Sequence, residues 1–61
     1  GPVPELTDLE DKCRELGVSP RLVEDFVDLK KSKKMHELEA HEIIGLKKHI
    51  IEFADKFKET A

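Results

Sequence analysis

Apolar residues recur at helical spacing in the C-terminal half of the chain. Five of them are separated by steps of three, four, three and four residues: Ile43, Leu46, Ile50, Phe53 and Phe57. This spacing places them on one face of a helix. Four more widen the apolar arc to about 180°, at 100° per residue: Ala40, Ile44, Ile51 and Ala54. Covering one face of a small bundle takes an arc of only about 100°, so the pattern predicts a helix with apolar surface to spare.

A first, shorter helix is predicted near the N-terminus. The run TDLE at residues 7–10 is a capping box, in which the Thr7 hydroxyl accepts from the Glu10 amide and the Glu10 carboxylate reaches back to the Thr7 amide. The predicted helix covers residues 8–16. It ends at Gly17, because glycine takes the left-handed conformation of a C-terminal cap without strain.

A second helix is predicted from Ser19, a favourable N-cap, with Pro20 at the first helical position, where its missing amide would have no partner anyway. It leads into the run KKSKK at residues 30–34, which contains no apolar residue. Two alternatives follow. One is a single helix over residues 33–58, and the other is a short turn at 34–38 followed by a separate helix from about residue 39. We favour the break.

These elements predict an all-α fold, a small three-helix bundle with a long C-terminal helix, or four helices if the segment after the lysines forms one of its own. The predicted core is Leu9, Cys13, Leu16, Leu22, Val23, Phe26, Val27, Leu29, Leu38, Ile43, Leu46, Ile50 and Phe53.

Gly1 and Pro2 are typical of a protease-cleavage scar from a fusion protein. Residues 3–61 are therefore expected to be a single small interaction domain taken from a larger protein.

Charge is distributed unevenly along the chain. The net charge is −3, with 41% charged residues. Residues 1–28 carry eight acidic against three basic residues, whereas residues 29–61 carry eight lysines against six acidic residues. The two halves can attract each other, or a second copy of the chain. The negative total favours neither nucleic acid nor a membrane surface, and no apolar run approaches the length of a transmembrane span.

The residue types that carry catalysis are present but not suitably spaced. His36 and His41 flank a glutamate, yet they are five residues apart and so about 140° apart on a helix, which does not suit a metal. Cys13 shares a helical face with Leu9 and Leu16, which is typical of a buried thiol. The sequence therefore predicts no enzyme, no metal and no cofactor.

The lysine cluster allows contact with phosphates. No aromatic residue is interleaved with the lysines to stack on bases, and the chain is acidic as a whole. Nucleic-acid binding is therefore the less favoured hypothesis. An acidic segment of a partner protein suits the same lysines.

The spare apolar surface predicts a protein–protein interaction domain of the scaffold or adaptor kind. The predicted interface is Ile44, Ile51, Phe53, Ala54 and Phe57, and the predicted rim of charges is Lys30, Lys31, Lys33, Lys34, Lys47 and Lys48. Homodimerisation is the favoured mode, because so small a core gains from association. Binding of an amphipathic peptide from another protein is the alternative. A single cysteine favours an intracellular protein, cytoplasmic or nuclear.

Overall fold

The computed structural model describes residues 3–60; Gly1 and Pro2, interpreted above as a cleavage scar, lie outside the described residues, as does Ala61. The elements in order are α1 (Pro4–Leu16), α2 (Pro20–Lys31), the 3-10 helix η1 (Met35–Glu37), α3 (Ala40–Glu52) and the 3-10 helix η2 (Ala54–Phe57). Residues 3–60 thus contain three α-helices and no strand, which confirms the all-α fold. The favoured break after α2 is present, but it forms one 3-10 turn rather than a fourth α-helix.

The start of α1 differs from the prediction. The helix begins at Pro4, with Val3 as N-cap in an extended conformation, and Thr7 lies inside it. The Thr7 hydroxyl donates to the Val3 carbonyl at 3.4 Å instead of accepting from an amide. The predicted capping box is therefore wrong. Pro4 starts the helix four residues earlier because its fixed φ angle suits the first helical position and its missing amide needs no partner there.

The connection from α1 to α2 follows the prediction. Gly17 caps α1 with a φ of 70°, in the left-handed region. The next amide, that of Val18, donates to the Cys13 carbonyl at 2.9 Å, and this turn directs the Val18 side chain into the core, where it is buried. Ser19 then caps α2, since its hydroxyl accepts from the Leu22 amide at 3.4 Å.

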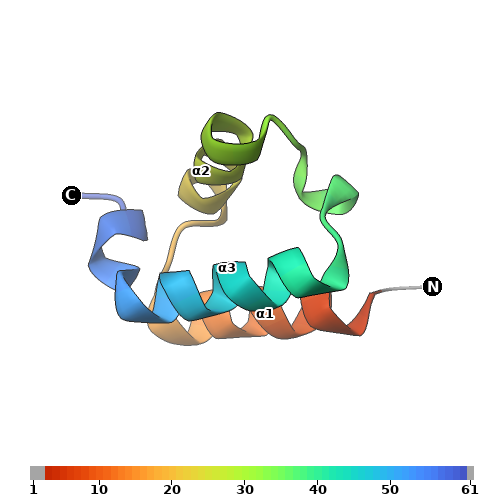
Figure 1. The fold of residues 1–61 in the computed structure, drawn as a ribbon. Helices are drawn as coiled ribbons and strands as arrows, with labels where there is room; N and C mark the ends of the chain where they lie inside the picture. The colour runs from red at the N-terminus through yellow and green to blue at the C-terminus, as the bar shows by residue number, and fades with distance from the viewer. Residues whose placement is uncertain (1–2, 61) are drawn as a thin grey trace.

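Helices α1 and α3 lie side by side and run in the same direction, while α2 crosses above them and is seen nearly end-on (Figure 1). Two contacts fix this parallel register. The Lys47 ammonium lies 2.5 Å from the Asp8 carboxylate near the middle of the pair. The Ser19 amide donates to the Phe57 carbonyl at 2.8 Å near its end. Because the pair is parallel, α2 and η1 together return the chain to the end at which α1 begins.

The core lies where the three helices meet. Its buried residues are Leu9, Cys13, Val18, Val23, Val27, Leu38, Ile43, Leu46, Ile50 and Phe57. Three further predicted members are only partly buried against it: Leu16, Leu22 and Phe26. Leu29 was wrongly placed in the core, because its side chain is 83% exposed. It follows Val27 by two residues, which puts it about 200° around the helix and so on the solvent side of α2.

The end of α3 also differs from the prediction. The helix stops at Glu52, well short of residue 58, and so is no longer than α1. Phe53 leaves the helical conformation, with φ −119° and ψ 35°, and η2 turns Phe57 into the core, where it is 4% exposed. Phe53 was wrongly placed in the core, since it is 37% exposed. Phe57 is thus buried in place of Phe53. This reversal follows from the change of helix type, because a 3-10 turn rotates side chains differently from an α-helix.

Candidate interaction surfaces

Neighbouring isoleucines on α3 have opposite environments. Ile43 and Ile50 are 2% and 0% exposed, whereas Ile44 and Ile51 are 50% and 48% exposed. Ile44 and Ile51 are seven residues apart, which brings them to the same side of the helix. We call this pair the isoleucine edge. It is apolar surface that the three helices do not cover.

The isoleucine edge borders α1. Lys47 lies between the two isoleucines along α3 and reaches Asp8 of α1 with its ammonium. The Lys47 and Asp8 side chains are 29% and 59% exposed, so the ion pair is open to solvent. Lys48 is exposed beside it. The edge thus combines apolar area with accessible charges of both signs.

The opposite flank of α3 faces α2 across a groove of about 390 Å³. It is lined by Phe26, Val27, Lys30, Lys31, Leu38, His41, Glu42, Gly45, Leu46 and His49. We call it the α2–α3 groove. The ring of His49 stacks on that of Phe26, with centroids 4.9 Å apart and planes 14° apart. The Lys30 ammonium lies 6.0 Å from the centroid of the Phe26 ring. Apolar side chains therefore form the floor of the groove and basic ones its rim.

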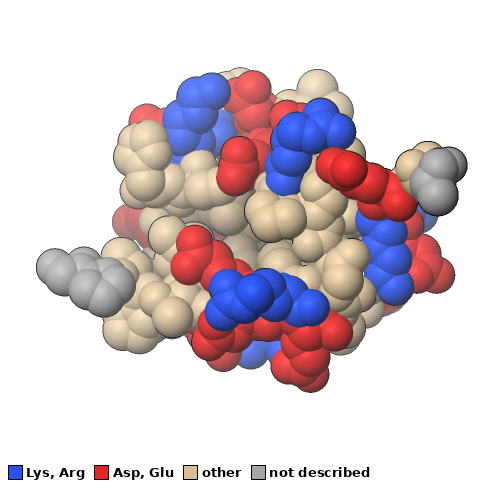
Figure 2. Space-filling model, turned by 180° about the vertical axis from the view of Figure 1, so that it is seen from behind, with Lys and Arg blue, Asp and Glu red and all other residues tan. Residues whose placement is uncertain are grey.

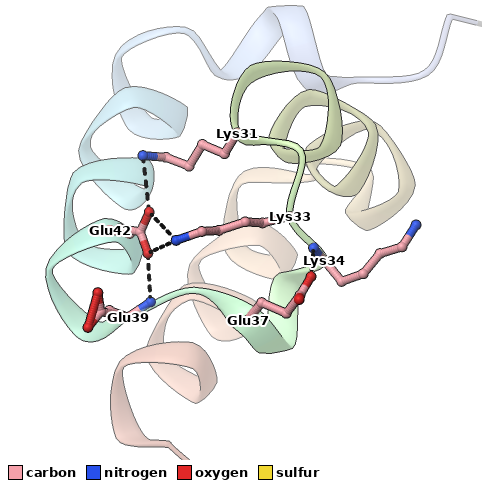
Figure 3. Close-up of polar contacts among 6 residues, drawn as sticks. All are labelled: Lys31, Lys33, Lys34, Glu37, Glu39 and Glu42. Carbon is pink, nitrogen blue, oxygen red and sulfur yellow. Dashed lines mark hydrogen bonds and ion pairs between the residues drawn. The ribbon is translucent and has the colours of Figure 1, made fainter.

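Glu42 joins the lysine segment to the start of α3 (Figure 3). Its carboxylate accepts from the Lys33 ammonium, 3.1 Å from each oxygen, and from the Glu39 amide at 2.9 Å. The Lys31 ammonium lies 3.3 Å away. The hydrogen bond from the Glu39 amide, followed by that from Lys33, lowers the pKa of Glu42 from 4.5 to about 2. With a side chain only 10% exposed, Glu42 engages two lysines, of which Lys31 lines the groove.

The predicted interface residues do not form one surface. Ile44 and Ile51 are exposed together, but Phe53 lies beyond the end of α3, with its ring 4.8 Å from that of His49 and under the Lys56 ammonium at 5.2 Å. Ala54 is partly buried against the core. Phe57 is buried, so placing it on an exposed interface was wrong. Its ring packs edge-on against Phe26 at 5.2 Å.

The predicted rim lysines are also divided. Lys31 and Lys33 are engaged by Glu42, and Lys47 is engaged by Asp8. Lys30, Lys34 and Lys48 are exposed. The role of Glu42 was missed, because the sequence pattern for a capping box begins with Ser, Thr, Asp or Asn, whereas Glu39 stands at that position. A glutamate three residues into a helix, before an apolar run, was the available signal.

The histidine and cysteine side chains have different environments. His49 belongs to the aromatic cluster with Phe26, Phe53 and Phe57, whereas His36 and His41 are exposed. Among residues 3–60, no three His, Cys, Asp or Glu side chains gather as metal ligands would. Cys13 is buried, and desolvation by burial, followed by the charge of Glu10, raises the pKa of its thiol.

Comparison with known proteins adds no family assignment. No family model matches the chain, and no curated protein or solved structure shows significant similarity to it. In the part of the chain that the structure describes, none of the helices has the length and apolar character needed to cross a bilayer. The surfaces described above are therefore the basis for inferring function.

Proposed function

We propose that this chain is a non-enzymatic protein–protein interaction domain that self-associates through the isoleucine edge of α3. The observation that carries the proposal is the contrast within each isoleucine pair. Ile43 and Ile50 complete the core, while Ile44 and Ile51, one heptad apart, are half exposed. A second copy that covers both side chains removes apolar area from water, which stabilises the dimer.

Symmetry suits this edge. In a two-fold dimer the same patch meets itself, so the patch must be self-complementary. Two exposed isoleucines on the same side of a helix, two turns apart, can pack against their copies in the partner. The surrounding charges are of both signs, with Lys48 on α3 and Asp8 on α1. Opposite charges on one patch meet their complements in a symmetric pair, which sets the register of the dimer.

The dimer is expected to be weak. Stable interfaces bury about 800 Å² per partner, and two half-exposed isoleucines supply only a small part of that area. The flanking ion pairs add little, because exposed salt bridges contribute roughly 0–1 kcal/mol each. Association is therefore expected only at high protein concentration, or where a larger protein brings two copies together. A single buried thiol is in keeping with the intracellular location suggested by the sequence.

Sedimentation equilibrium from low micromolar to near-millimolar concentration, at low and high salt, tests the proposal. We expect the wild type to dimerise at the upper end and the dimer to persist in high salt. Ile51→Asp is expected to be monomeric with unchanged far-UV helicity. Leu29→Asp is the matched control, since Leu29 is an exposed apolar residue on α2, and it is expected to dimerise like the wild type. A monomeric wild type, or equal association by Ile51→Asp, would contradict the proposal.

Nucleic-acid binding has less support. Three of the six predicted rim lysines already engage carboxylates of the same chain. On the face seen from behind, acidic and basic side chains are interspersed (Figure 2). Phosphate binding depends on uncompensated positive charge, and its affinity falls steeply with salt. The persistence of association at high salt therefore separates the two functions.

A further inference from the structure

The α2–α3 groove has features that the fold itself does not require. It lies on the flank of α3 opposite the isoleucine edge, and self-association through that edge leaves it open. We propose that this groove receives an acidic segment of another protein that carries an apolar anchor residue. This binding extends the proposed interaction role to a second surface and does not depend on the dimer.

The floor of the groove suits an apolar anchor. Val27, Leu38 and Leu46 are buried beneath it, and the stacked rings of Phe26 and His49 form one end. The volume of about 390 Å³ is at the lower end of the range for ligand pockets, which runs from about 300 to 1,000 Å³. An aromatic or branched side chain that enters this space is transferred from water to apolar surroundings. Burial of one such side chain contributes most of the affinity at sites of this kind.

Gly45 gives an independent reason to expect an occupant. It lies in the interior of α3 and lines the groove. Glycine there destabilises a helix by about 1 kcal/mol relative to alanine. The fold does not explain this, because a Cβ atom added at Gly45 would meet nothing within 4 Å and its φ angle is not positive. Close approach of another chain to the α3 backbone does explain it, since a missing side chain lets the two backbones come near.

The charges around the groove favour carboxylates on the occupant. Lys30, Lys31 and His41 lie on its rim, and Glu42, the carboxylate among the lining residues, is shared between Lys31 and Lys33, so the lysines around the groove outnumber the carboxylate. The exposed acidic residues of α2 line a different hollow, next to η1: Glu24, Asp25 and Asp28. A basic segment is therefore not favoured at the groove, whereas an acidic one meets unlike charge there, which speeds its encounter and fixes its orientation.

Selection from a phage-displayed library of random twelve-residue peptides identifies the preferred ligand. The domain carries Ile51→Asp, so that self-association does not interfere. We expect enrichment of peptides with one aromatic or branched apolar residue flanked by Asp or Glu. Failure to enrich such peptides, or enrichment of basic ones, would overturn the proposal. A single-stranded oligonucleotide that displaced the selected peptides would also overturn it, because the site would then bind phosphate.

Two variants locate the binding. Gly45→Leu fills the groove, and we expect it to lower the affinity for the selected peptide by at least about tenfold. We expect a loss of the same size from Lys30→Glu. Lys48→Glu is the matched charge control, because Lys48 is exposed but does not line the groove, and it is expected to bind normally. When the domain is titrated with the selected peptide, its amide chemical shifts are expected to change near Lys30, Gly45 and His49. Shifts centred on Ile44, or unchanged affinity in Gly45→Leu, would show that the peptide binds elsewhere.

Failure of this inference and failure of the proposed self-association are distinguishable. If the wild type dimerises, and Ile51→Asp is monomeric and still selects acidic peptides, both proposals hold on separate surfaces. If the wild type is monomeric throughout while the groove binds peptides, only self-association is wrong. If the wild type dimerises and Gly45→Leu abolishes the dimer, the occupant of the groove is a second copy, and the inference of a different partner is overturned.

Discussion

The two flanks of α3 present apolar surface in different shapes. Toward α1, Ile44 and Ile51 form an exposed edge beside an open ion pair. Toward α2, the apolar side chains are recessed in a groove and the charged ones gather at its rim. An edge packs well against a copy of itself, whereas two grooves placed face to face leave a void. One helix therefore offers a surface suited to a symmetric partner and another suited to a protruding side chain of a different chain.

The largest expected effect comes from the core beneath the two flanks of α3. Ile50 is 0% exposed and its neighbour Ile51 is 48% exposed. Ile50→Ala is expected to destabilise the domain by roughly 2–5 kcal/mol, because it removes buried methyl groups and leaves a cavity. A core of this size supplies only about 3–5 kcal/mol, so the variant is expected to be largely unfolded at 25 °C. Urea unfolding followed by far-UV circular dichroism measures this.

Ile51→Ala is the matched comparison. It removes the same atoms from the next position, and we expect a change of less than about 1 kcal/mol in dilute solution, where the protein is monomeric. Equal destabilisation by the two variants would mean that Ile51 belongs to the core. The distinction between the edge and the core would then be lost, and with it the basis for self-association.

The second effect concerns the groove flank. Glu42→Gln removes the charge that holds Lys31 and Lys33 but keeps an oxygen for the Glu39 amide. At pH 7 we expect a lower melting temperature than in the wild type. The folded-state pKa of Glu42 is about 2, below its ordinary value of 4.5. Its ionised form therefore stabilises the fold above pH 4.5, and this contribution is lost as the pH falls from 4.5 toward 2.

The measurement is the melting temperature of both proteins between pH 7 and pH 2. We expect the difference between them to be constant above about pH 5 and to shrink steadily below it. Taking the difference removes the contribution of the other carboxylates, which titrate in both proteins. A difference that stays constant down to pH 2 would mean that the Glu42 charge does not stabilise the fold.

Local chemistry explains which parts of the fold were predictable. Gly17 and Ser19 mark helix ends through their own conformational and hydrogen-bonding preferences, and both were placed correctly. The period of the apolar residues identified most of the core. Thr7 was misplaced because two start signals stand three residues apart, and the sequence pattern does not rank a capping box above a proline at the first position.

Tertiary packing explains the rest. Val18 lies in a turn and belongs to no helical period, so its burial depends on how α1 and α2 meet. Phe57 is buried and Phe53 exposed, the reverse of the prediction, because α3 is followed by a 3-10 turn. No residue near Glu52 signals this turn. The isoleucine edge was predictable from the width of the apolar arc. The groove was not, since it depends on how α2 crosses α3.

The smallest effect is expected at the ion pair beside the isoleucine edge. Asp8 and Lys47 are both partly open to solvent, so Asp8→Asn is expected to change stability by less than about 1 kcal/mol. For a domain of this size that is a shift in melting temperature below about 8 °C. Added salt screens an exposed pair, so the wild type should lose this advantage at high ionic strength. Melting curves of the two proteins at low and high salt are therefore expected to converge, and a difference that survives high salt would mean that the pair is shielded from solvent. The more enclosed Glu42 cluster is expected to resist salt, and that difference in screening distinguishes the two flanks of α3.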